Sequence, residues 1–235
     1  RIYSLKLERR GAIMVAFVDD ECVMSWRDPE PLAGTRIGYF TTGPKVYAAE
    51  MEVSSPNVID ETFGRAPVDW RVAAGSWKVE NRWTCDPRWS FMGGHSEKGL
   101  AAIWSKYRFE GDVTVDMFVG PRMESSKAKP RYSDTRDLNI TLAADGVDLV
   151  SGYSFLYGGF GNTRTVIVRG DEALPVAEGR PKALFDYHGV HRRWFHLKAT
   201  KKGPKVQFFL NGTLIREYVD PKPLGGDRAA IWTYD

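Results

Sequence analysis

The carboxylate with the strongest claim to chemistry is Asp116, in the middle of an alternating run at 112–119 that predicts a β-strand. Asp112, Thr114 and Asp116 then lie on one face of that strand. A retaining glycosidase needs two carboxylates about 5–5.5 Å apart, and the sequence contains no Glu-x-Asp-x-x-Glu pattern to supply them. Two interpretations stay open: a catalytic Asp116, or an exposed or hydrogen-bonded strand residue.

The preceding predicted strand, at 99–106, contributes two residues that suit a sugar. Trp104 and Lys106 are two positions apart, so they point to the same side of it. An indole ring can stack on the apolar face of a sugar, while Lys106 and Asp116 hydrogen-bond to its hydroxyl groups. We therefore expect a substrate-binding site on these two strands. The alternative is that Trp104 belongs to the hydrophobic core.

The stretch 152–164 is the most unusual local sequence. Tyr153, Phe155 and Tyr157 alternate onto one side, and two glycines follow that let a backbone or a ligand approach closely. Beyond them, Asn162 and Arg164 are suited to a hydroxyl or carboxylate group of a ligand. We expect Tyr153, Tyr157, Asn162 and Arg164 to bind substrate; the alternative is that the aromatic residues fill the core.

The histidines occur in two settings. His95 lies in a glycine-rich stretch near two tryptophans, where we expect contact with a ligand and where plain solvent exposure is the alternative. His188 and His191 stand three positions apart, but no carboxylate or cysteine cluster completes a ligand set. No metal site is therefore predicted from the residues themselves.

Length and charge narrow the class of protein. A chain of 235 residues holds one large all-β domain, or one domain and part of another. Its 33 basic and 30 acidic residues are spread out without a long basic block, so no nucleic-acid partner is expected. No run approaches the roughly 18 apolar residues of a membrane span. Cys22 and Cys85 do not demand a disulfide, and Cys22 is interpreted as a small buried hydrophobe.

The elements that must position these residues are strands. Short alternating runs are bounded by glycine, proline, asparagine and aspartate, with strong hairpin signals at Asp145-Gly146 and Asn211-Gly212. No helical period extends far enough for a helix. The sequence predicts an all-β protein of about fifteen short strands, arranged as a two-sheet antiparallel sandwich.

The chain also repeats itself. Residues 3–43 align without a gap on 195–235, and the motif Asp-Pro-x-Pro-Leu-x-Gly-x-Arg begins at Asp28 and again at Asp220. The copies keep prolines, glycines and strand aromatics but vary the polar residues. We therefore interpret the repeat as architecture, with Asp28 and Asp220 capping a proline-stiffened turn.

Motifs near both ends of 60–235 stand in a familiar order. They are Phe63, Asp69-Trp70, Gly75-x-Trp77-x-Val79, Gly111-Asp112-Val113, Leu210-Asn211-Gly212, the Asp220 motif and Ala230-Ile231-Trp232-Thr233. On these residues the segment resembles the concanavalin A-like lectin/glucanase jelly roll, and within it bacterial sandwich domains of the 3-keto-disaccharide hydrolase type. The resemblance implies a carbohydrate ligand, and calcium as a candidate ion held by backbone carbonyls and an aspartate. That superfamily includes lectins, glycoside hydrolases, polysaccharide lyases and packing modules, so the fold does not choose among them.

The repeat and the resemblance together suggest two segments. Residues 60–235 are expected to form the main sandwich, and residues 1–55 the closing strands of a first sandwich. Those closing strands either belong to a longer tandem protein or pack on the main domain and cover an open sheet edge. Both arrangements remain open.

The leading functional hypothesis is a carbohydrate-binding module, accessory to a larger glycan-processing protein. An oligo- or polysaccharide is the expected partner, beside further domains of the same polypeptide, and the expected location is extracellular or periplasmic. The first alternative is a glycoside hydrolase or related sugar-cleaving enzyme, which requires two convergent acid–base groups. The second is a structural module without a ligand, which requires Trp104, Tyr153 and Tyr157 to be buried.

Overall fold

The structure of the protein is a computed structural model. It describes residues 3–10, 12–32, 37, 38, 40, 42, 58–61, 63, 66–81, 90–120, 137–175 and 194–234. The chain divides into two compact units, Arg1–Val58 and Ile59–Asp235. This division falls between the segments 1–55 and 60–235 that the sequence suggested.

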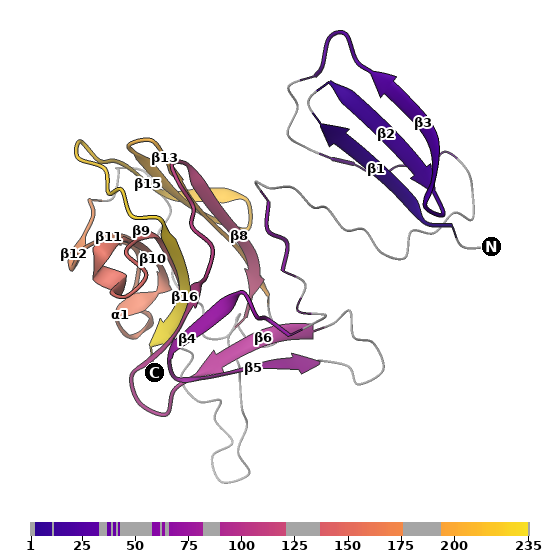
Figure 1. The fold of residues 1–235 in the computed structure, drawn as a ribbon. Coiled ribbons are helices and arrows are strands. Elements are labelled where there is room, and N and C mark those ends of the chain that lie inside the picture. The colour runs from indigo at the N-terminus through magenta and orange to yellow at the C-terminus, as the bar shows by residue number, and fades with distance from the viewer. Residues whose placement is uncertain are drawn as a thin grey trace. The chain divides into compact units, whose positions relative to one another are not determined.

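Unit 1 contains one antiparallel sheet of three strands (Figure 1). Strand β1 (Leu5–Arg10) pairs with β2 (Ile13–Val18), which pairs with β3 (Glu21–Arg27). The β2–β3 turn places Asp19 and Asp20 at φ 49° and 68°. This is the left-handed backbone that a two-residue hairpin turn requires.

Unit 2 is built mainly from strands that alternate along the chain with turns. They are β4 (Trp70–Ala74), β5 (Ser76–Asn81), β6 (Ser90–His95), β7 (Leu100–Ser105), β8 (Val113–Val119), β9 (Leu138–Ala144), β10 (Tyr153–Gly158), β11 (Arg164–Arg169), β12 (Glu172–Ala173), β13 (Phe195–Lys202), β14 (Lys205–Leu210), β15 (Thr213–Val219) and β16 (Arg228–Tyr234). Its helical turns are short: a 3₁₀ turn at Leu149–Ser151 and α1 (Gly159–Asn162). The prediction of an all-β chain is confirmed.

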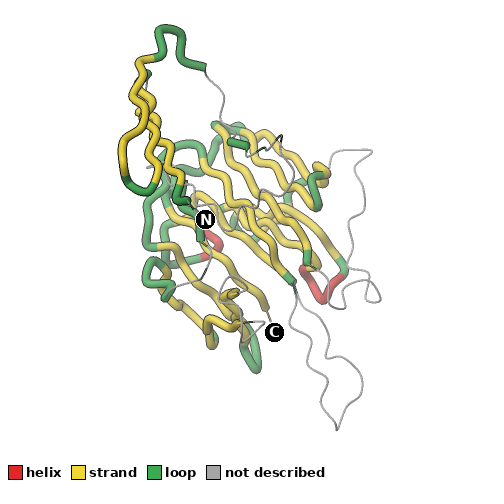
Figure 2. Tube along the Cα trace, turned by 90° about the vertical axis from the view of Figure 1, so that its right-hand side faces the viewer, coloured by secondary structure: helices red, strands yellow, loops and turns green. Residues whose placement is uncertain are grey.

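The strands of unit 2 form two main sheets and a separate β5–β6 hairpin (Figures 1 and 2). The larger sheet has seven strands in the order β12-β11-β10-β9-β16-β7-β4. The smaller has four strands in the order β15-β14-β13-β8, and all the paired strands run antiparallel. One apolar cluster joins both sheets, so the sandwich predicted from the sequence is confirmed.

The core between the sheets follows from strand alternation. Ile140, Leu142 and Phe155 from the larger sheet share one cluster with Leu197 and Phe208 from the smaller sheet, and all five are buried. Every second residue of a strand points to the same side, so each strand contributes its apolar half to this layer. The other half of each strand lies on an outer face.

The Asp-Pro-x-Pro-Leu motif turns the chain from β15 toward β16. Asp220 Oδ1 accepts a hydrogen bond from the Lys222 amide at 2.8 Å, and Asp28 Oδ1 accepts one from the Glu30 amide at 3.0 Å. Both aspartates therefore cap their turns, as predicted. Asp220 Oδ2 also accepts hydrogen bonds from the Tyr153 hydroxyl at 2.5 Å and Arg169 Nε at 2.7 Å.

Two further expectations concern single residues and membranes. Cys22 is exposed and free, so its interpretation as a buried hydrophobe is wrong. All seven residues of β3 are exposed, so neither face of this strand is buried, and the sequence pattern alone does not reveal this. Cys85 lies outside the described residues. Within the part of the chain that is described, no helix has the length and apolar character needed to cross a bilayer.

Candidate functional site

The predicted grouping of Asp116 with Trp104 and Lys106 is not formed. Strand β7, which carries Trp104, pairs with β4 and β16 in the larger sheet. Strand β8, which carries Asp116, pairs with β13 in the smaller sheet. The two strands are consecutive in the sequence but lie in different layers, so the expectation that they are neighbours is wrong.

Trp104 is a core residue. It is 2% exposed and packs with Ala144 and Ala230 in a small apolar cluster of the larger sheet. A buried indole has no free face for a sugar ring, so the expectation that Trp104 binds a substrate is not retained. The alternative, that Trp104 belongs to the hydrophobic core, is the one that the structure supports.

Tyr153 and Tyr157 are also buried in the core between the sheets. The Tyr157 ring meets the Phe195 ring edge-on, with centroids 5.2 Å apart. The Tyr153 hydroxyl donates to Asp220 and accepts from the Leu224 amide at 2.9 Å. Burial, followed by the hydrogen bond to Asp220, raises the pKa of Tyr153. Both tyrosines are core residues, so the expectation that they bind a substrate is not met. Together with Trp104 they are buried, as the structural-module alternative requires.

Of three other predicted residues, Asn162 and Arg164 are close neighbours in the chain, and His95 lies on a different sheet. Arg164, at the start of β11, is exposed, and its guanidinium lies 5.3 Å from the centroid of the Phe160 ring. His95 is exposed at the end of β6, opposite Ser76. Asn162 ends the helical turn α1, and its side chain is outside the described part of the structure. His188 and His191 are outside it as well.

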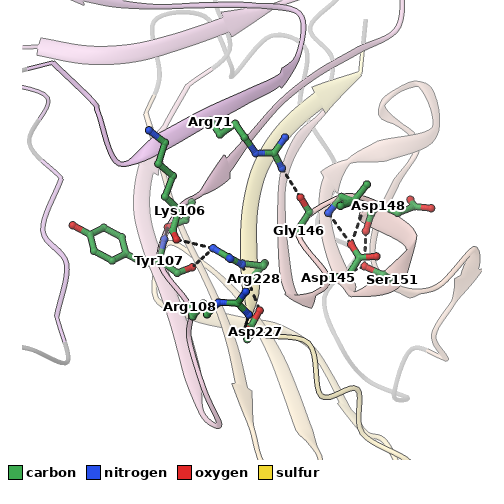
Figure 3. A network of polar contacts seen from close by, with 12 residues as sticks. Arg71, Lys106, Tyr107, Arg108, Asp145, Gly146, Asp148, Ser151, Asp227 and Arg228 are labelled. Carbon is green, nitrogen blue, oxygen red and sulfur yellow. Dashed lines mark hydrogen bonds and ion pairs between the residues drawn. The ribbon is translucent and has the colours of Figure 1, made fainter.

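Lys106 belongs to a polar network around the ends of β4, β7 and β16 (Figure 3). Its Nζ donates to the Val68 carbonyl at 2.5 Å. Arg228 Nη1 donates to the Lys106 carbonyl at 2.6 Å, and Arg71 Nη2 donates to the Gly146 carbonyl at 2.5 Å. These cations satisfy main-chain carbonyls of neighbouring turns, so the network stabilises the end of the sheet.

The same network contains Asp145 and Asp148 (Figure 3). Asp145 Oδ1 accepts hydrogen bonds from the Val147 amide at 2.7 Å and the Asp148 amide at 2.9 Å. The bonds from Asp148 and Val147 lower the pKa of Asp145. Its Oδ1 atom is thus used within the turn. Among the described residues, no group of three or more His, Cys, Asp or Glu side chains is arranged to hold a metal ion.

A second polar group lies on the side of the larger sheet that faces away from the smaller one. Thr141 Oγ1 and Ser154 Oγ are 2.7 Å apart, and Trp232 Nε1 donates to Thr141 Oγ1 at 2.8 Å. Beside them, burial raises the pKa of Asp137, and the Asn139 side chain acts to lower it. Neither amide atom of Asn139 has a hydrogen-bond partner in good geometry. Asn139, Thr141 and Ser154 are all buried, so a ligand has no direct access to them.

The outer face of the smaller sheet is different, because its polar and aromatic side chains meet solvent. On β8, Thr114, Asp116 and Phe118 are exposed, while the residues between them point inward. Strand β13 lies alongside, with Lys198 opposite Asp116 and His196 opposite Phe118. Directly opposed residues of an antiparallel pair have Cβ atoms about 4.5–5.5 Å apart, so these four side chains form one patch. We call Asp116, Phe118, His196 and Lys198 the β8–β13 patch.

Within the β8–β13 patch, His196 joins the other strand through two contacts. Its Nε2 lies within hydrogen-bond distance of Asp116 Oδ1. Its ring stacks on the Phe118 ring with centroids 4.9 Å apart and an interplanar angle of 22°. Phe118 nevertheless remains 73% exposed. The imidazole therefore supports one face of Phe118 and leaves the remainder of the ring open to water.

The patch continues across the sheet. Lys198 Nζ lies 5.8 Å from the centroid of the Phe209 ring on β14, a cation–π distance. Farther along, Gln207 Nε2 donates to Glu217 Oε2 at 2.5 Å. The face thus alternates aromatic surface with hydrogen-bonding groups of both charges, all carried on strands. A ligand rich in hydroxyl groups and with apolar faces matches this arrangement.

The arrangement does not provide a glycosidase pair from Asp116 and Glu217. Strands β8 and β15 are separated by β13 and β14, so their backbones are about 14 Å apart at about 4.8 Å per strand. Retaining enzymes place their carboxyl groups about 5–5.5 Å apart and inverting enzymes about 6.5–9.5 Å apart. Asp112, which directly precedes β8, accepts a hydrogen bond from the Gly203 amide at 2.7 Å. Asp116 is therefore suited to hold a hydroxyl group, with His196 fixing its orientation.

The sequence did not identify Phe118 or His196 as site residues. Phe118 was visible as an aromatic residue on the same face as Asp116, since the two are two positions apart on one strand. His196 is 80 positions away from Asp116, and its place follows only from the pairing of β8 with β13. That pairing has no local signal in the chain.

Comparison with known proteins gives similarities at the level of the fold. A carbohydrate-binding module of Bacillus subtilis (CBM66) matches with a TM-score of 0.48 and 16% identity, over 71% of this chain and 92% of that chain. A Bacillus subtilis protein of unknown function with a galectin-like fold gives 0.44 and 15%, over 74% and 91%. A β-glucanase of Bacillus licheniformis gives 0.41 and 9%, over 74% and 83%.

These neighbours are of the kinds that the sequence resembles, lectin-like and glucanase-like sandwiches. At such scores and identities they carry no argument about activity. No protein-family model and no curated protein matches the sequence. The case for a function therefore depends on the residues of this chain.

Proposed function

We propose that the protein is a carbohydrate-binding β-sandwich module that binds an oligo- or polysaccharide on the β8–β13 patch. The observation that carries the proposal is the Phe118 ring, which is 73% exposed near the end of β8 and stacked on His196. A large apolar side chain exposed beside fixed polar groups is more informative than one that stands alone. Its neighbours are the charged side chains of Asp116 and Lys198.

The physical basis is the match between this patch and a sugar ring. The carbon–hydrogen face of a pyranose is apolar and nearly flat, so it loses contact with water when it lies on an aromatic ring. The ring's hydroxyl groups then reach outward to polar side chains, where Asp116 accepts and Lys198 donates. Because the groups stand on paired strands, little conformational freedom is lost on binding.

The proposal assigns binding rather than catalysis to Asp116. Its carboxylate is engaged by His196, and the other carboxylates considered on this face, Asp112 and Glu217, do not form a pair with it at catalytic distance. A binding module needs no acid–base pair. As part of the same proposal, the module acts outside the cell or in a periplasm, where polysaccharides are found, as an accessory to further domains that process glycans.

A glycan array tests the proposal directly. Wild-type protein is compared with Phe118→Ala, which removes the stacking ring, and with Phe160→Ala as a matched control. Phe160 is also an exposed phenylalanine, but it belongs to α1 beside the larger sheet. We expect wild-type protein and Phe160→Ala to bind the same glycans and Phe118→Ala to lose them. Binding of no glycan by the wild type, or equal binding by all three proteins, overturns the proposal.

A further inference from the structure

The three-stranded sheet of unit 1 has the same construction as β13–β14–β15 of unit 2. Leu5 pairs with Val18 as Leu197 pairs with Leu210. Each residue of the first pair lies 192 positions before its counterpart in the second pair. The agreement extends to an irregularity. The register shifts between Ala16 and Phe17 in one sheet, and between Phe208 and Phe209 in the other. A shared bulge at the same position is a specific feature, because bulges set strand twist and register.

The connecting hydrogen bonds are shared as well. Asp19 and Asn211 both have φ 49° at the hairpin turn. The Asp19 amide donates to the Ser4 carbonyl at 2.9 Å, and the Asn211 amide donates to the His196 carbonyl at 2.8 Å. The Ser4 amide in turn donates to Asp19 Oδ1, as the His196 amide donates to Asn211 Oδ1. The two sheets are therefore the same element in local geometry.

One face of each sheet is polar and aromatic in the same way. Lys6 Nζ lies 5.1 Å from the centroid of the Phe17 ring, and Lys198 Nζ lies 5.8 Å from that of Phe209. In unit 2 this is the outer face of the sandwich. Because side chains alternate, the opposite face of the unit 1 sheet corresponds to the face that unit 2 buries.

That opposite face, which we call the inner face, is exposed in unit 1. Leu5 is 74% exposed, Leu7 64% and Val23 58%. Their counterparts Leu197, Ala199 and Ile215 are buried under the larger sheet. The described residues of unit 1 form no second layer over this apolar face, and an antiparallel sheet needs such a layer for its stability.

At one matching position of the inner face, both sheets pair one large side chain with one alanine. Leu7 is opposite Ala16 across the β1–β2 pair, whereas Ala199 is opposite Phe208 across the β13–β14 pair. The large residue has moved from one strand to its neighbour. Cores accept such changes when total volume and pattern are kept. The inner face thus keeps the apolar pattern of its counterpart in unit 2 and differs in which strand carries the bulky side chain.

We infer that the inner face of the β1–β2–β3 sheet is an interaction surface for the apolar face of a larger antiparallel sheet, built like β9–β10–β11. That larger sheet and the β1–β2–β3 sheet are then the two layers of one sandwich, in which residues 3–27 are the closing strands. The partner's side chains are aliphatic and aromatic at alternate positions, as Ile140, Phe155 and Tyr157 are in unit 2. Packing follows the usual spacing of about 10 Å between sheets.

A graft within the full chain tests this inference, with the chain's own larger sheet as the probe. Residues 195–219 are replaced by the sequence of residues 3–27, and unfolding is followed by calorimetry and near-ultraviolet circular dichroism. A second graft carries Leu5→Lys and Leu7→Lys on the inner face, and a third carries Lys6→Ala on the other face. We expect cooperative unfolding of unit 2 in the first and third grafts, and its loss in the second.

A further graft keeps the result decisive if the first fails to fold. It carries Leu7→Ala with Ala16→Phe, which restores the bulk pattern of Ala199 and Phe208. Cooperative unfolding of this graft supports the inference, because the first graft then fails only through the position of its bulky side chain. If neither graft unfolds cooperatively, or if the inner-face lysines have no effect, the inference is overturned.

Discussion

His196 on β13 forms a hydrogen bond with Asp116 on β8, and its ring stacks on the Phe118 ring of the same strand with centroids 4.9 Å apart. One imidazole thus fixes both the acceptor and the aromatic surface of the β8–β13 patch. The positions of three side chains depend on one strand pairing.

Phe118→Ala is expected to abolish glycan binding at little cost in stability. The side chain is mostly in water, so its removal should change the free energy of unfolding by about 1 kcal/mol or less. Urea unfolding gives the stability, and a glycan array or calorimetric titration gives the binding. A large loss of stability would show that Phe118 is a packing residue.

His196→Ala is expected to weaken glycan binding roughly tenfold by releasing Phe118 and Asp116 from their fixed positions, since such stacking contributes about 1 kcal/mol. Thr114→Ala is the matched control, because Thr114 is exposed on the same face of β8. Titration calorimetry compares the two variants. Equal affinities would contradict a positioning role for His196.

The strands could be predicted from the sequence, whereas their assignment to sheets could not. Alternation is a local property, so the strand at 112–119 and the outward position of Asp116 follow from neighbouring residues. The pairing of Asp116 with Lys198 depends on how distant strands meet. The same limit explains Trp104, because alternation shows which residues share a face but not whether another layer covers it.

Asp220 is expected to make the sandwich sensitive to acid. Burial alone would raise the pKa of its carboxyl, but hydrogen bonds from Tyr153, the Lys222 amide and Arg169 hold the pKa below its ordinary value. The folded state then binds fewer protons than the unfolded state around this pKa. The stabilisation by Asp220 is therefore present above the unfolded-state pKa, about 3.9, and is lost as the pH falls through the folded-state value.

Asp220→Asn tests this dependence by thermal unfolding between pH 7 and pH 3. The variant should be less stable than wild type at pH 7, and the difference should narrow below about pH 4. Burial raises the pKa of Asp137, which acts in the opposite direction, but Asp137 is present in both proteins and cancels in the difference. A difference that stays constant with pH would contradict the assignment to Asp220.

Tyr153→Phe is expected to lower the free energy of unfolding by about 1–3 kcal/mol, because it leaves Asp220 and the Leu224 amide without the shared hydroxyl. Urea unfolding measures the loss. The folded variant should bind glycans as wild type does, since Tyr153 is buried away from the β8–β13 patch. Loss of glycan binding by a folded Tyr153→Phe variant would show that Tyr153 takes part in glycan binding.

Gly226→Ala is expected to destabilise the sandwich by about 1–3 kcal/mol through overpacking. A Cβ atom at Gly226 would lie 2.3 Å from the Ala143 carbonyl oxygen, whereas one at Gly225 would have nothing within 4 Å. Gly225→Ala is therefore the matched control and should leave stability nearly unchanged. Equal midpoints of urea unfolding for the two variants would contradict the expected overpacking at Gly226.

The most direct test of glycan binding on the β8–β13 patch is a map of backbone amide chemical shifts during titration with the best glycan of the array. We predict that the largest changes occur at Asp116, Phe118, His196 and Lys198, with little change at Arg164 or His95. Changes confined to β10, β11 and α1, or to the network around Arg228, would contradict the account and place the ligand elsewhere on the sandwich.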